Sequence, residues 1–451
     1  WQAFAKTRGR QNQVITAWTD ETTGARIQVP KDEADFRAHH LKYIQSRIKK
    51  LRQQPVKRKS EIRDAEPTNY ARTALDAAMD LHDRHCTQYE DKRVSFGIIR
   101  MANITPCVAM ARFLLKADLP ADTAVRILPY HSRFPRVTRH FIEVELDSAL
   151  RRKDPQKIFT LPEIRKHLSH IRQTNFLFIV VATPIEELGR DHDFDWAVLE
   201  PSSIRSLIQM AGRVLRHRQV KALDLPNVIL LNHNVNALLN QSIAYTRPGY
   251  ESKRFPLASH NLRDILDEKT IRQQTDSALR IARVKHPDPA NNLLSLEHCS
   301  LDNLLLEGGK SDCESVPGWN HGPWHLADIA QKQKPFRKGS REESFYVIPE
   351  EPDYRLQFHQ KDDEGPMHLR DQWVKHTELS AREEKRLWKP VEYVHWLEEI
   401  AEPMNLGMLR AAKRFGEIGV PDYMREPGAA QAYFNVHLGL WQQKDLGTLF
   451  E

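Results

Sequence analysis

The sequence predicts an α/β fold in which a parallel β-sheet carries helices on both faces. Two observations lead to this prediction. Short apolar runs alternate with amphipathic stretches over residues 93–235, which is the pattern of strands joined by right-handed helical crossovers. The run FLFIVVA at 176–182 is apolar at every position, as expected of a strand whose two faces are both covered.

The expected strands follow one another at short intervals. They lie at residues 94–102, 125–129, 176–182, 196–199 and 227–232. Helices are expected between them. Thr105 can cap the first, with Pro106 at its first position, where a missing N–H costs nothing. In the helix after the second strand, Val137, Phe141 and Val144 are expected to share one apolar side.

The rest of the chain lacks this rhythm, and 451 residues are enough for two or three domains. We expect a charged, mostly helical segment at 1–92 and the parallel-sheet domain at 93–250. A linker at 251–345 and a small mixed C-terminal domain at 346–451 complete the expected division. The chain opens with Trp1 rather than Met, which indicates a processed or truncated polypeptide.

Composition indicates a soluble protein with polyanionic partners. The net charge is +7, and ten lysines and arginines against one acid lie between Arg37 and Arg63. Such cations displace counterions from nucleic-acid phosphates, although a solvated helix face explains the run equally well. The longest apolar run, at 176–182, is too short to cross a bilayer, and the four scattered cysteines form no CxxC pair. We therefore expect a cytoplasmic protein without membrane contact.

The most informative stretch is PSSIRSLIQMAGRVLRHR at 201–218. As one helix capped by Ser202 or Ser203, it has an apolar stripe on one side and an acid-free basic side on the other. The basic side carries Arg205, Gln209, Gly212, Arg213 and Arg216. A glycine in mid-helix costs about 1 kcal/mol, which makes sense where a ligand approaches the backbone. Arginines beside it can grip a phosphate, and a plain basic surface helix is the alternative.

A second stretch, VVATPIEELGRDHDFDWAV at 180–198, brings two polar side chains to the end of a buried strand. Thr183 follows the strand directly, and Asp191 comes eight residues later. Parallel sheets bind ligands at the carboxyl ends of their strands. The Thr183 hydroxyl can therefore meet a phosphate, and Asp191 can accept a ribose hydroxyl. Taken alone, an ordinary acidic loop explains this stretch better.

Together the two stretches resemble motifs V and VI of superfamily 2 helicases, in the same order and at a matching separation. Motif VI, QxxGRxxR, is met in full by Gln209, Gly212, Arg213 and Arg216. The stretch YHSRFPRVTR at 130–139 resembles the HSRF motif of such helicases. Together with the DHDFD loop, this HSRF motif resembles the corresponding motifs of the CRISPR-associated helicase–nuclease of type I interference. The sequence EPSSIRSLIQMAGRVLRHR resembles that of subtype I-F. The specific resemblance covers roughly residues 93–235.

The resemblance implies the second RecA-like lobe of the motor, followed by a linker and a C-terminal domain. Arg213 and Arg216 would be arginine fingers that reach ATP held on another lobe, and Gln209 would help to position the attacking water. The nucleotide contacts implied in this chain are Gly189, Asp191 and Gly212. No metal ligand is implied.

The resemblance also implies what the intact protein binds. Contacts to the backbone of single-stranded DNA are implied for Ser132, Arg133 and Thr183. ATP and Mg²⁺ would be bound mainly by a first lobe, and divalent metal ions by an HD nuclease, both outside this chain. The intact protein would couple ATP hydrolysis to 3′–5′ movement along single-stranded DNA and would degrade that DNA. Its implied partners are the RNA-guided surveillance complex and the spacer integrase, with a phage inhibitor protein as a further candidate.

Several motif-like strings do not belong to this pattern. No GxxxxGK[ST] loop is present, so this chain alone is expected to be inactive as an ATPase. GGKS at 308–311 lacks the first glycine of that loop, and DEAD at 32–35 does not end a buried strand. His82–Asp83 lies in an amphipathic stretch, where packing is the better explanation. A zinc site is also disfavoured, because the candidate ligands have no CxxC spacing. These candidates are Cys299, Cys313, His321 and His325.

Two other functions stay open at this point. One is a different superfamily 2 motor, such as an RNA helicase or a restriction translocase, which a comparison of single-stranded DNA with single-stranded RNA would separate. The other is a non-catalytic nucleic-acid-binding fragment. The sequence upstream of Trp1 would decide that case, because a motor requires its Walker A and Walker B motifs there.

Overall fold

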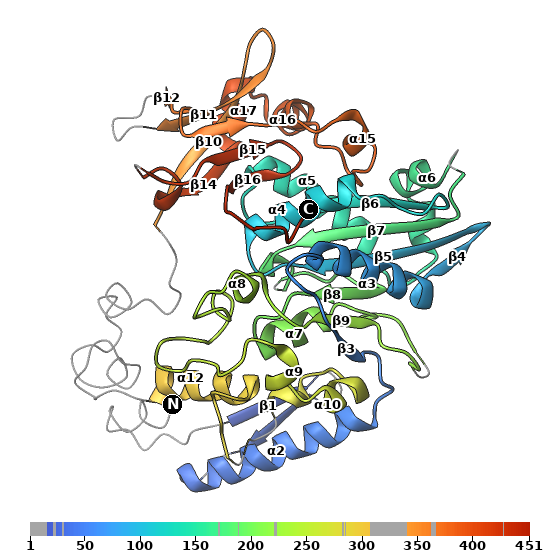
Figure 1. The fold of residues 1–451 in the computed structure, drawn as a ribbon, viewed down its shortest axis with the longest axis vertical. Coiled ribbons are helices and arrows are strands. Elements are labelled where there is room, and N and C mark those ends of the chain that lie inside the picture. Colours follow the sequence, from blue (N-terminus) through green and yellow to red (C-terminus); the bar gives the residue numbers. More distant parts are fainter. Residues whose placement is uncertain are drawn as a thin grey trace. The chain divides into compact units, whose positions relative to one another are not determined.

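The computed structural model describes most of the chain (Figure 1). The described residues are 16–20, 24–28, 31–169, 172–187, 189–220, 223–281, 284, 286–306, 341–361, 367–426 and 428–451. They fall into two compact units. The first unit takes the described residues of Trp1–Pro55, Ser277–Pro289 and Leu294–Lys338, and the second those of Val56–Asp276, Ala290–Leu293 and Gly339–Glu451.

The first unit is small and contains a two-stranded antiparallel sheet and helices. Its elements are β1 (Thr16–Asp20), β2 (Gly24–Gln28), α2 (Glu33–Gln53), α11 (Ala278–Ile281) and most of α12 (Leu293–Leu306). Asp32 caps α2 by accepting a hydrogen bond from the backbone N–H of Asp35 at 2.8 Å. The DEAD string therefore begins a helix and ends no strand, as the sequence indicated.

The second unit is built on a seven-stranded sheet, and the predicted α/β fold is confirmed. The strand order is β3-β9-β8-β5-β7-β6, with β4 paired antiparallel to β5 and every other pair parallel. The strands are β3 (Ser60–Arg63), β4 (Thr87–Tyr89), β5 (Lys92–Arg100), β6 (Thr123–Tyr130), β7 (Asn175–Ala182), β8 (Trp196–Leu199) and β9 (Val228–Leu231). All five expected strands are present.

The sheet begins earlier in the chain than residue 93. Strand β3 pairs with β9 through a four-residue register, and only Ile62 among its residues is apolar. Buried and half-buried side chains alternate along this strand. Ser60 and Ile62 are buried, and Glu61 and Arg63 are half-buried. A short edge strand of this polarity carries too little hydrophobic periodicity to be found from sequence.

Helices cover the sheet and supply most of its apolar partners. They are α3 (Tyr70–His85), α4 (Ile104–Lys116), α5 (Arg136–Leu150), α6 (Pro162–Leu168), α7 (Ile204–Ala211), α8 (Val235–Leu238), α9 (Leu262–Ile265) and α10 (Glu268–Gln273), with short 3₁₀ turns η1 (Lys157–Thr160) and η2 (Pro184–Glu187). Asn103, and not Thr105, precedes α4, and the Thr105 hydroxyl donates instead to the carbonyl of Gln442 at 3.0 Å. In α5, Val137 is buried but Val144 is 50% exposed, so the expected apolar side was only partly right.

The C-terminal region of the second unit contains two further sheets with helices. The four-stranded sheet has the order β12-β11-β10-β14 and the three-stranded sheet the order β13-β15-β16. Their elements are β10 (Glu342–Glu350), β11 (Arg355–Lys361), β12 (Met367–Leu369), β13 (Val374–His376), α15 (Ala381–Glu384), α16 (Tyr393–Ala401), η4 (Glu402–Met404), α17 (Met408–Phe415), β14 (Glu417–Pro421), η5 (Asp422–Met424), β15 (Ala432–Asn435) and β16 (Gly439–Gln442). Their core includes Val137 of α5, so this region packs directly on the main sheet domain.

Among the described residues, no helix combines the length and the apolar character that a membrane crossing requires.

Candidate nucleotide and nucleic-acid site

The stretch 201–218 forms a shorter helix than its sequence indicated. Helix α7 is capped by Ser203, whose hydroxyl accepts from the N–H of Ser206, and it ends at Ala211 with Gly212 as the C-cap. Beyond Gly212 the chain pairs with the residues before β8, because Phe194 donates to Arg213 O at 2.9 Å and accepts from Leu215 N at 3.0 Å. The expectation that Gly212 lies in mid-helix, with Arg213 and Arg216 on one helical face, is therefore wrong.

Arg213 nevertheless lies in a position suited to an anion. Its side chain is buried, with 5% of the residue exposed, and Nη2 donates to the carbonyl of Glu187 at 3.0 Å. Its Nε and Nη1 are also buried and have no hydrogen-bond partner within the part of the chain that the structure describes. Burial, together with the nearby charge of Arg216, lowers the pKa of Arg213. An additional anionic partner would satisfy these two nitrogens.

Arg216 and Asp191 contact one another directly. The Nε of Arg216 donates to Asp191 Oδ1 at 2.7 Å, and the Nε2 of His217 lies 3.0 Å from the same oxygen. The partial burial of Asp191 raises its pKa, but the hydrogen bonds from Arg216 and His217 outweigh this effect. The pKa of Asp191 is therefore lowered. The structure thus joins two residues, one from each predicted stretch, that lie 25 positions apart.

Gly189, Gln209 and Gly212 are the other residues predicted at the nucleotide site. Gly189 is exposed and has φ +71°, a conformation that L side chains rarely adopt, so the loop before Asp191 depends on a glycine there. Gln209 lies half-exposed near the end of α7. A Cβ at Gly212 would lie 3.1 Å from the carbonyl oxygen of Ile208, which is a tight contact.

A buried ion pair that the sequence did not reveal holds these loops together. Arg100, at the end of β5, donates to Glu187 Oε1 through Nη2 at 2.7 Å and Nε at 3.1 Å. The same guanidinium donates to Glu200 O and to the hydroxyls of Ser202 and Ser206. The Arg100 and Glu187 side chains are 1% and 3% exposed. Because Glu187 O is also the acceptor for Arg213, this pair positions the arginine.

Buried aspartates of the DHDFD loop form a second unpredicted cluster. Asp193 accepts from the backbone N–H of Arg216 at 3.1 Å and from Arg218 Nη2 at 2.8 Å. Asp195 accepts from Arg152 at 3.0 Å and from the N–H of Phe96 at 2.7 Å. Both aspartates are almost fully buried. Their alternate spacing is the only sequence signal that could have indicated this inward direction.

The predicted single-strand residues lie at the carboxyl ends of two neighbouring strands. Thr183 directly follows β7 and its N–H donates to Tyr130 O, the last residue of β6, at 3.2 Å. Ser132 is exposed two residues further on, whereas Thr183 is 5% exposed. The structure therefore brings the HSRF motif and the start of the second stretch together.

Arg133 is occupied by the C-terminal region. Its Nη2 donates to Glu342 Oε1 at 2.7 Å, and its Nη1 donates to the carbonyl of Gly419. Its own carbonyl accepts from Leu440 N at 2.8 Å. Only 7% of Arg133 is exposed, so a contact with DNA would require the guanidinium to leave these partners. The predicted DNA contact of Arg133 stays a prediction.

We expect Arg133→Ala to lower the free energy of unfolding by about 1–3 kcal/mol, because it leaves the carbonyl of Gly419 and the carboxylate of Glu342 without their donors. Urea unfolding of the chain measures this change. Arg139→Ala, at a half-exposed arginine of α5, removes the same charge and serves as the matched control. Unchanged stability combined with weaker single-strand binding would instead favour the DNA contact.

The remaining motif-like residues carry no site among the described residues. His82 is buried in α3, its Nδ1 lies 2.7 Å from Ser95 Oγ, and burial lowers its pKa to about 4. In the described ranges, no group of three or more His, Cys, Asp or Glu side chains could hold a metal ion. Cys313, His321, His325 and the GGKS string lie outside the described residues.

Comparison with known proteins gives consistent matches. The family model "CRISPR-associated nuclease/helicase Cas3, C-terminal" matches residues 93–219. A relative from Pseudomonas aeruginosa, named CRISPR-associated nuclease/helicase Cas3 subtype I-F/YPEST, is 33% identical over 91% of this chain and 39% of its own length. The relative of the same name from Pectobacterium atrosepticum is 36% identical over 81% of this chain and 35% of its own length. The chain therefore spans less than two fifths of these relatives.

Among solved structures, "Crystal structure of T. fusca Cas3-AMPPNP" is 14% identical with a TM-score of 0.40, covering 86% of this chain and 42% of that one. A likeness this low adds nothing to the sequence comparison.

Proposed function

Because the chain belongs to the CRISPR-associated nuclease/helicase Cas3 family, as a portion of its C-terminal part, we propose that it supplies the second RecA-like lobe of an ATP-driven motor on single-stranded DNA. One observation carries the proposal. Arg213 is buried with two nitrogens that lack a partner among the described residues, next to the loop that holds Asp191. A phosphate of ATP bound by another lobe would supply the missing acceptors, since a guanidinium binds phosphate oxygens in pairs.

On the nucleotide side, the proposal assigns Arg213 and Arg216 as fingers toward that phosphate and Gln209 as the residue that helps to position water. Asp191 with Gly189 and Gly212 would contact the nucleotide. In the structure Arg216 is bound to Asp191, so nucleotide binding would exchange this pair for one phosphate contact and one ribose contact. ATP would supply the free energy for movement. Its Mg²⁺ would be held mainly by the first lobe, outside this chain.

The phosphate-cradling loop is also proposed to lie on another part of the protein. No GxxxxGK[ST] motif occurs in this sequence, so β- and γ-phosphates have no loop to hold them here. This chain alone would therefore not turn over ATP. In the intact protein it would complete the nucleotide site of a first lobe.

On the nucleic-acid side, Ser132 and Thr183 are proposed to contact the DNA backbone from the carboxyl ends of β6 and β7, with Arg133 as a third contact if it is released from Glu342.

In the intact protein, movement along the DNA would run 3′–5′, and a nuclease with its own metal ions would degrade the DNA strand. The surveillance complex, the spacer integrase and a phage inhibitor protein are the proposed partners, in the cytoplasm. The linker at 251–345 and the accessory domain at 346–451 stay part of this proposal. We propose that the lobe, predicted at 93–250, also includes β3, since this strand pairs with β9.

The chain should bind single-stranded DNA through contacts to the sugar–phosphate backbone of the DNA. With a net charge of +7, we expect the logarithm of the affinity for oligo(dT) to fall linearly with the logarithm of the salt concentration. Oligo(dT) and a mixed-sequence strand of equal length should bind alike. Fluorescence anisotropy at several salt concentrations measures both, with single-stranded RNA as the comparison. An affinity that does not change with salt concentration, or that is higher for single-stranded RNA, would favour a different superfamily 2 protein.

A further inference from the structure

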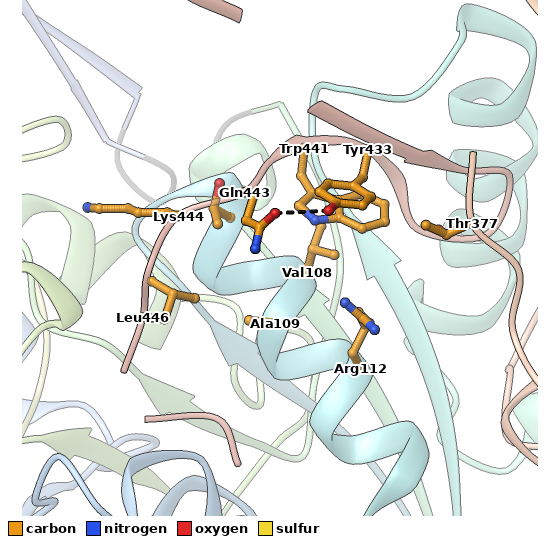
Figure 2. A pocket seen from close by; sticks show the side chains of 10 residues that line it. Val108, Ala109, Arg112, Thr377, Tyr433, Trp441, Gln443, Lys444 and Leu446 are labelled. Atoms are coloured by element: carbon orange, nitrogen blue, oxygen red, sulfur yellow. Dashed lines mark hydrogen bonds between the residues drawn. The ribbon is translucent and has the colours of Figure 1, made fainter. Parts of the chain in front are cut away.

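A pocket of about 360 Å³ opens beside helix α4, and neither Arg213 nor Asp191 is among its lining residues (Figure 2). One wall is a single face of α4, formed by Thr105, Val108, Ala109 and Arg112 at helical spacing. The opposite wall comes from the three-stranded C-terminal sheet and the segment after it. These residues are Thr377, Tyr433, Trp441, Gln443, Lys444 and Leu446. Both walls belong to the second unit.

The aromatic wall of the pocket is fixed in place. The rings of Tyr433 and Trp441 stack with centroids 5.7 Å apart and an interplanar angle of 18°. The Tyr433 hydroxyl donates to Gln443 Oε1 at 2.9 Å, and Trp441 is 6% exposed. Figure 2 shows this ring pair above the side chains of Val108 and Arg112. A rigid aromatic wall over an apolar floor suits a flat ring.

The charge at the pocket is positive. Its lining includes the cations Arg112 and Lys444 and no acid. Arg112 is exposed, and Lys444 donates to Asn236 Oδ1 at 3.4 Å, near the limit of a hydrogen bond. The nearest acid along α15, Glu383, accepts from the Ser380 hydroxyl at 2.7 Å and pairs with Lys116 at 3.9 Å. An anionic group bound here would therefore meet the positive charges of Arg112 and Lys444, which Glu383 and Glu200 compensate in part.

The position of the pocket connects it to the proposed DNA path. Thr105 lies in the first turn of α4, five residues after β5 ends at Arg100. Strand β5 is parallel to β7 and adjacent to it, and β7 is adjacent to β6. The carboxyl ends of these strands therefore meet at one edge of the sheet, where Ser132 and Thr183 also lie. A DNA strand that follows this edge would pass the start of α4, where Thr105 lines the pocket.

We propose that this pocket holds one nucleotide of a single-stranded nucleic acid, with its base against Tyr433 and its phosphate beside Arg112. The proposal rests on the single-strand binding proposed above and extends it to the C-terminal region. A volume of 360 Å³ lies near the low end of small-ligand pockets, about 300–1,000 Å³, which fits one nucleotide. A duplex cannot use the site, because its bases are already stacked on each other.

Four variants of the full chain test the pocket by oligo(dT) anisotropy. Tyr433→Leu keeps an apolar side chain against Trp441 but removes the flat ring, and we expect affinity to fall about 5- to 100-fold. Tyr433→Phe keeps the ring and should bind like the wild type. Arg112→Gln should lower the slope of log affinity against log salt by about 0.7. Lys116→Gln, on the same helix but already paired with Glu383, should leave that slope unchanged.

Photocrosslinking supplies a readout that does not depend on affinity. Oligo(dT) carrying one 5-iodouracil should crosslink to Tyr433 or Trp441 in the wild-type chain, as mapped by peptide mass spectrometry. This result supports the proposal even if Tyr433→Leu fails to fold, which thermal melting would reveal. Free dTMP, added in excess, should not bind measurably, because it lacks the neighbouring backbone contacts at Ser132 and Thr183.

The outcomes separate the two proposals. If the wild-type chain binds no oligo(dT), the proposed function and the pocket both fail. If it binds, but all four variants behave alike and crosslinks map elsewhere, the pocket proposal alone is overturned. Binding of dTMP that depends on Tyr433, with oligo(dT) binding that does not, also overturns it, since the site then takes a free nucleotide.

Discussion

Arg213→Lys in the full-length protein is expected to lower the DNA-stimulated ATPase rate by about 10³-fold or more. The reason is geometric, because lysine keeps the positive charge but loses the planar fork that binds two phosphate oxygens at once. In this structure the fork is already held by Glu187 O, with Nε and Nη1 left for a ligand. Steady-state ATPase assays at saturating DNA measure the loss.

Affinity for single-stranded DNA should stay near the wild-type value in Arg213→Lys, because the proposed DNA contacts lie at Ser132 and Thr183. Arg205→Lys, at a half-exposed arginine of helix α7, is the matched control and should leave the ATPase rate close to wild type. Weaker DNA binding by Arg213→Lys, with full ATPase at saturating DNA, would make the arginine part of a DNA surface and refute its assignment as a finger.

The sequence predicts that the motifs lie close together, but it does not predict the local backbone conformation around them. The contact that joins the two predicted stretches is the hydrogen bond from Arg216 to Asp191. The helix over 201–218 was overextended because its apolar positions continue past Gly212. Val214 keeps that apolar pattern, yet it is buried by pairing with Phe194 as an isolated bridge. Helical periodicity and burial alone cannot distinguish these two arrangements.

The ion pairs that hold the site could not be predicted, for a different reason. Arg100 and Glu187 are 87 positions apart, and Arg133 and Glu342 are 209 apart. No local pattern links such partners, since their encounter depends on sheet order and on where the C-terminal region packs. Arg100 ends a strand in which it follows the apolar residues Ile98 and Ile99, and nothing in that pattern identifies its partner.

The Arg100–Glu187 pair leads to the second large expected effect, on stability. Glu187→Gln should lower the free energy of unfolding by about 3–5 kcal/mol, because it leaves a buried guanidinium without its counter-charge. Urea unfolding measures this loss of unfolding free energy. An unchanged m-value would show that the loss does not come from a change in the compactness of the unfolded state. Glu163→Gln is the matched control. It breaks a partly exposed pair with Lys389 at 3.4 Å and should cost less than about 1 kcal/mol.

A double-mutant cycle distinguishes the pair from the shape of its surroundings. Arg100→Met should be costly alone, because Glu187 is then buried without a cation. Combined with Glu187→Leu it should cost much less than the sum of the single changes, since no buried charge remains. The double variant should still lose ATPase activity in the full-length protein, because Glu187 O is then no longer fixed as the acceptor for Arg213. Additive costs in the cycle would show that Arg100 and Glu187 act independently, and the pair would then not be what positions Arg213.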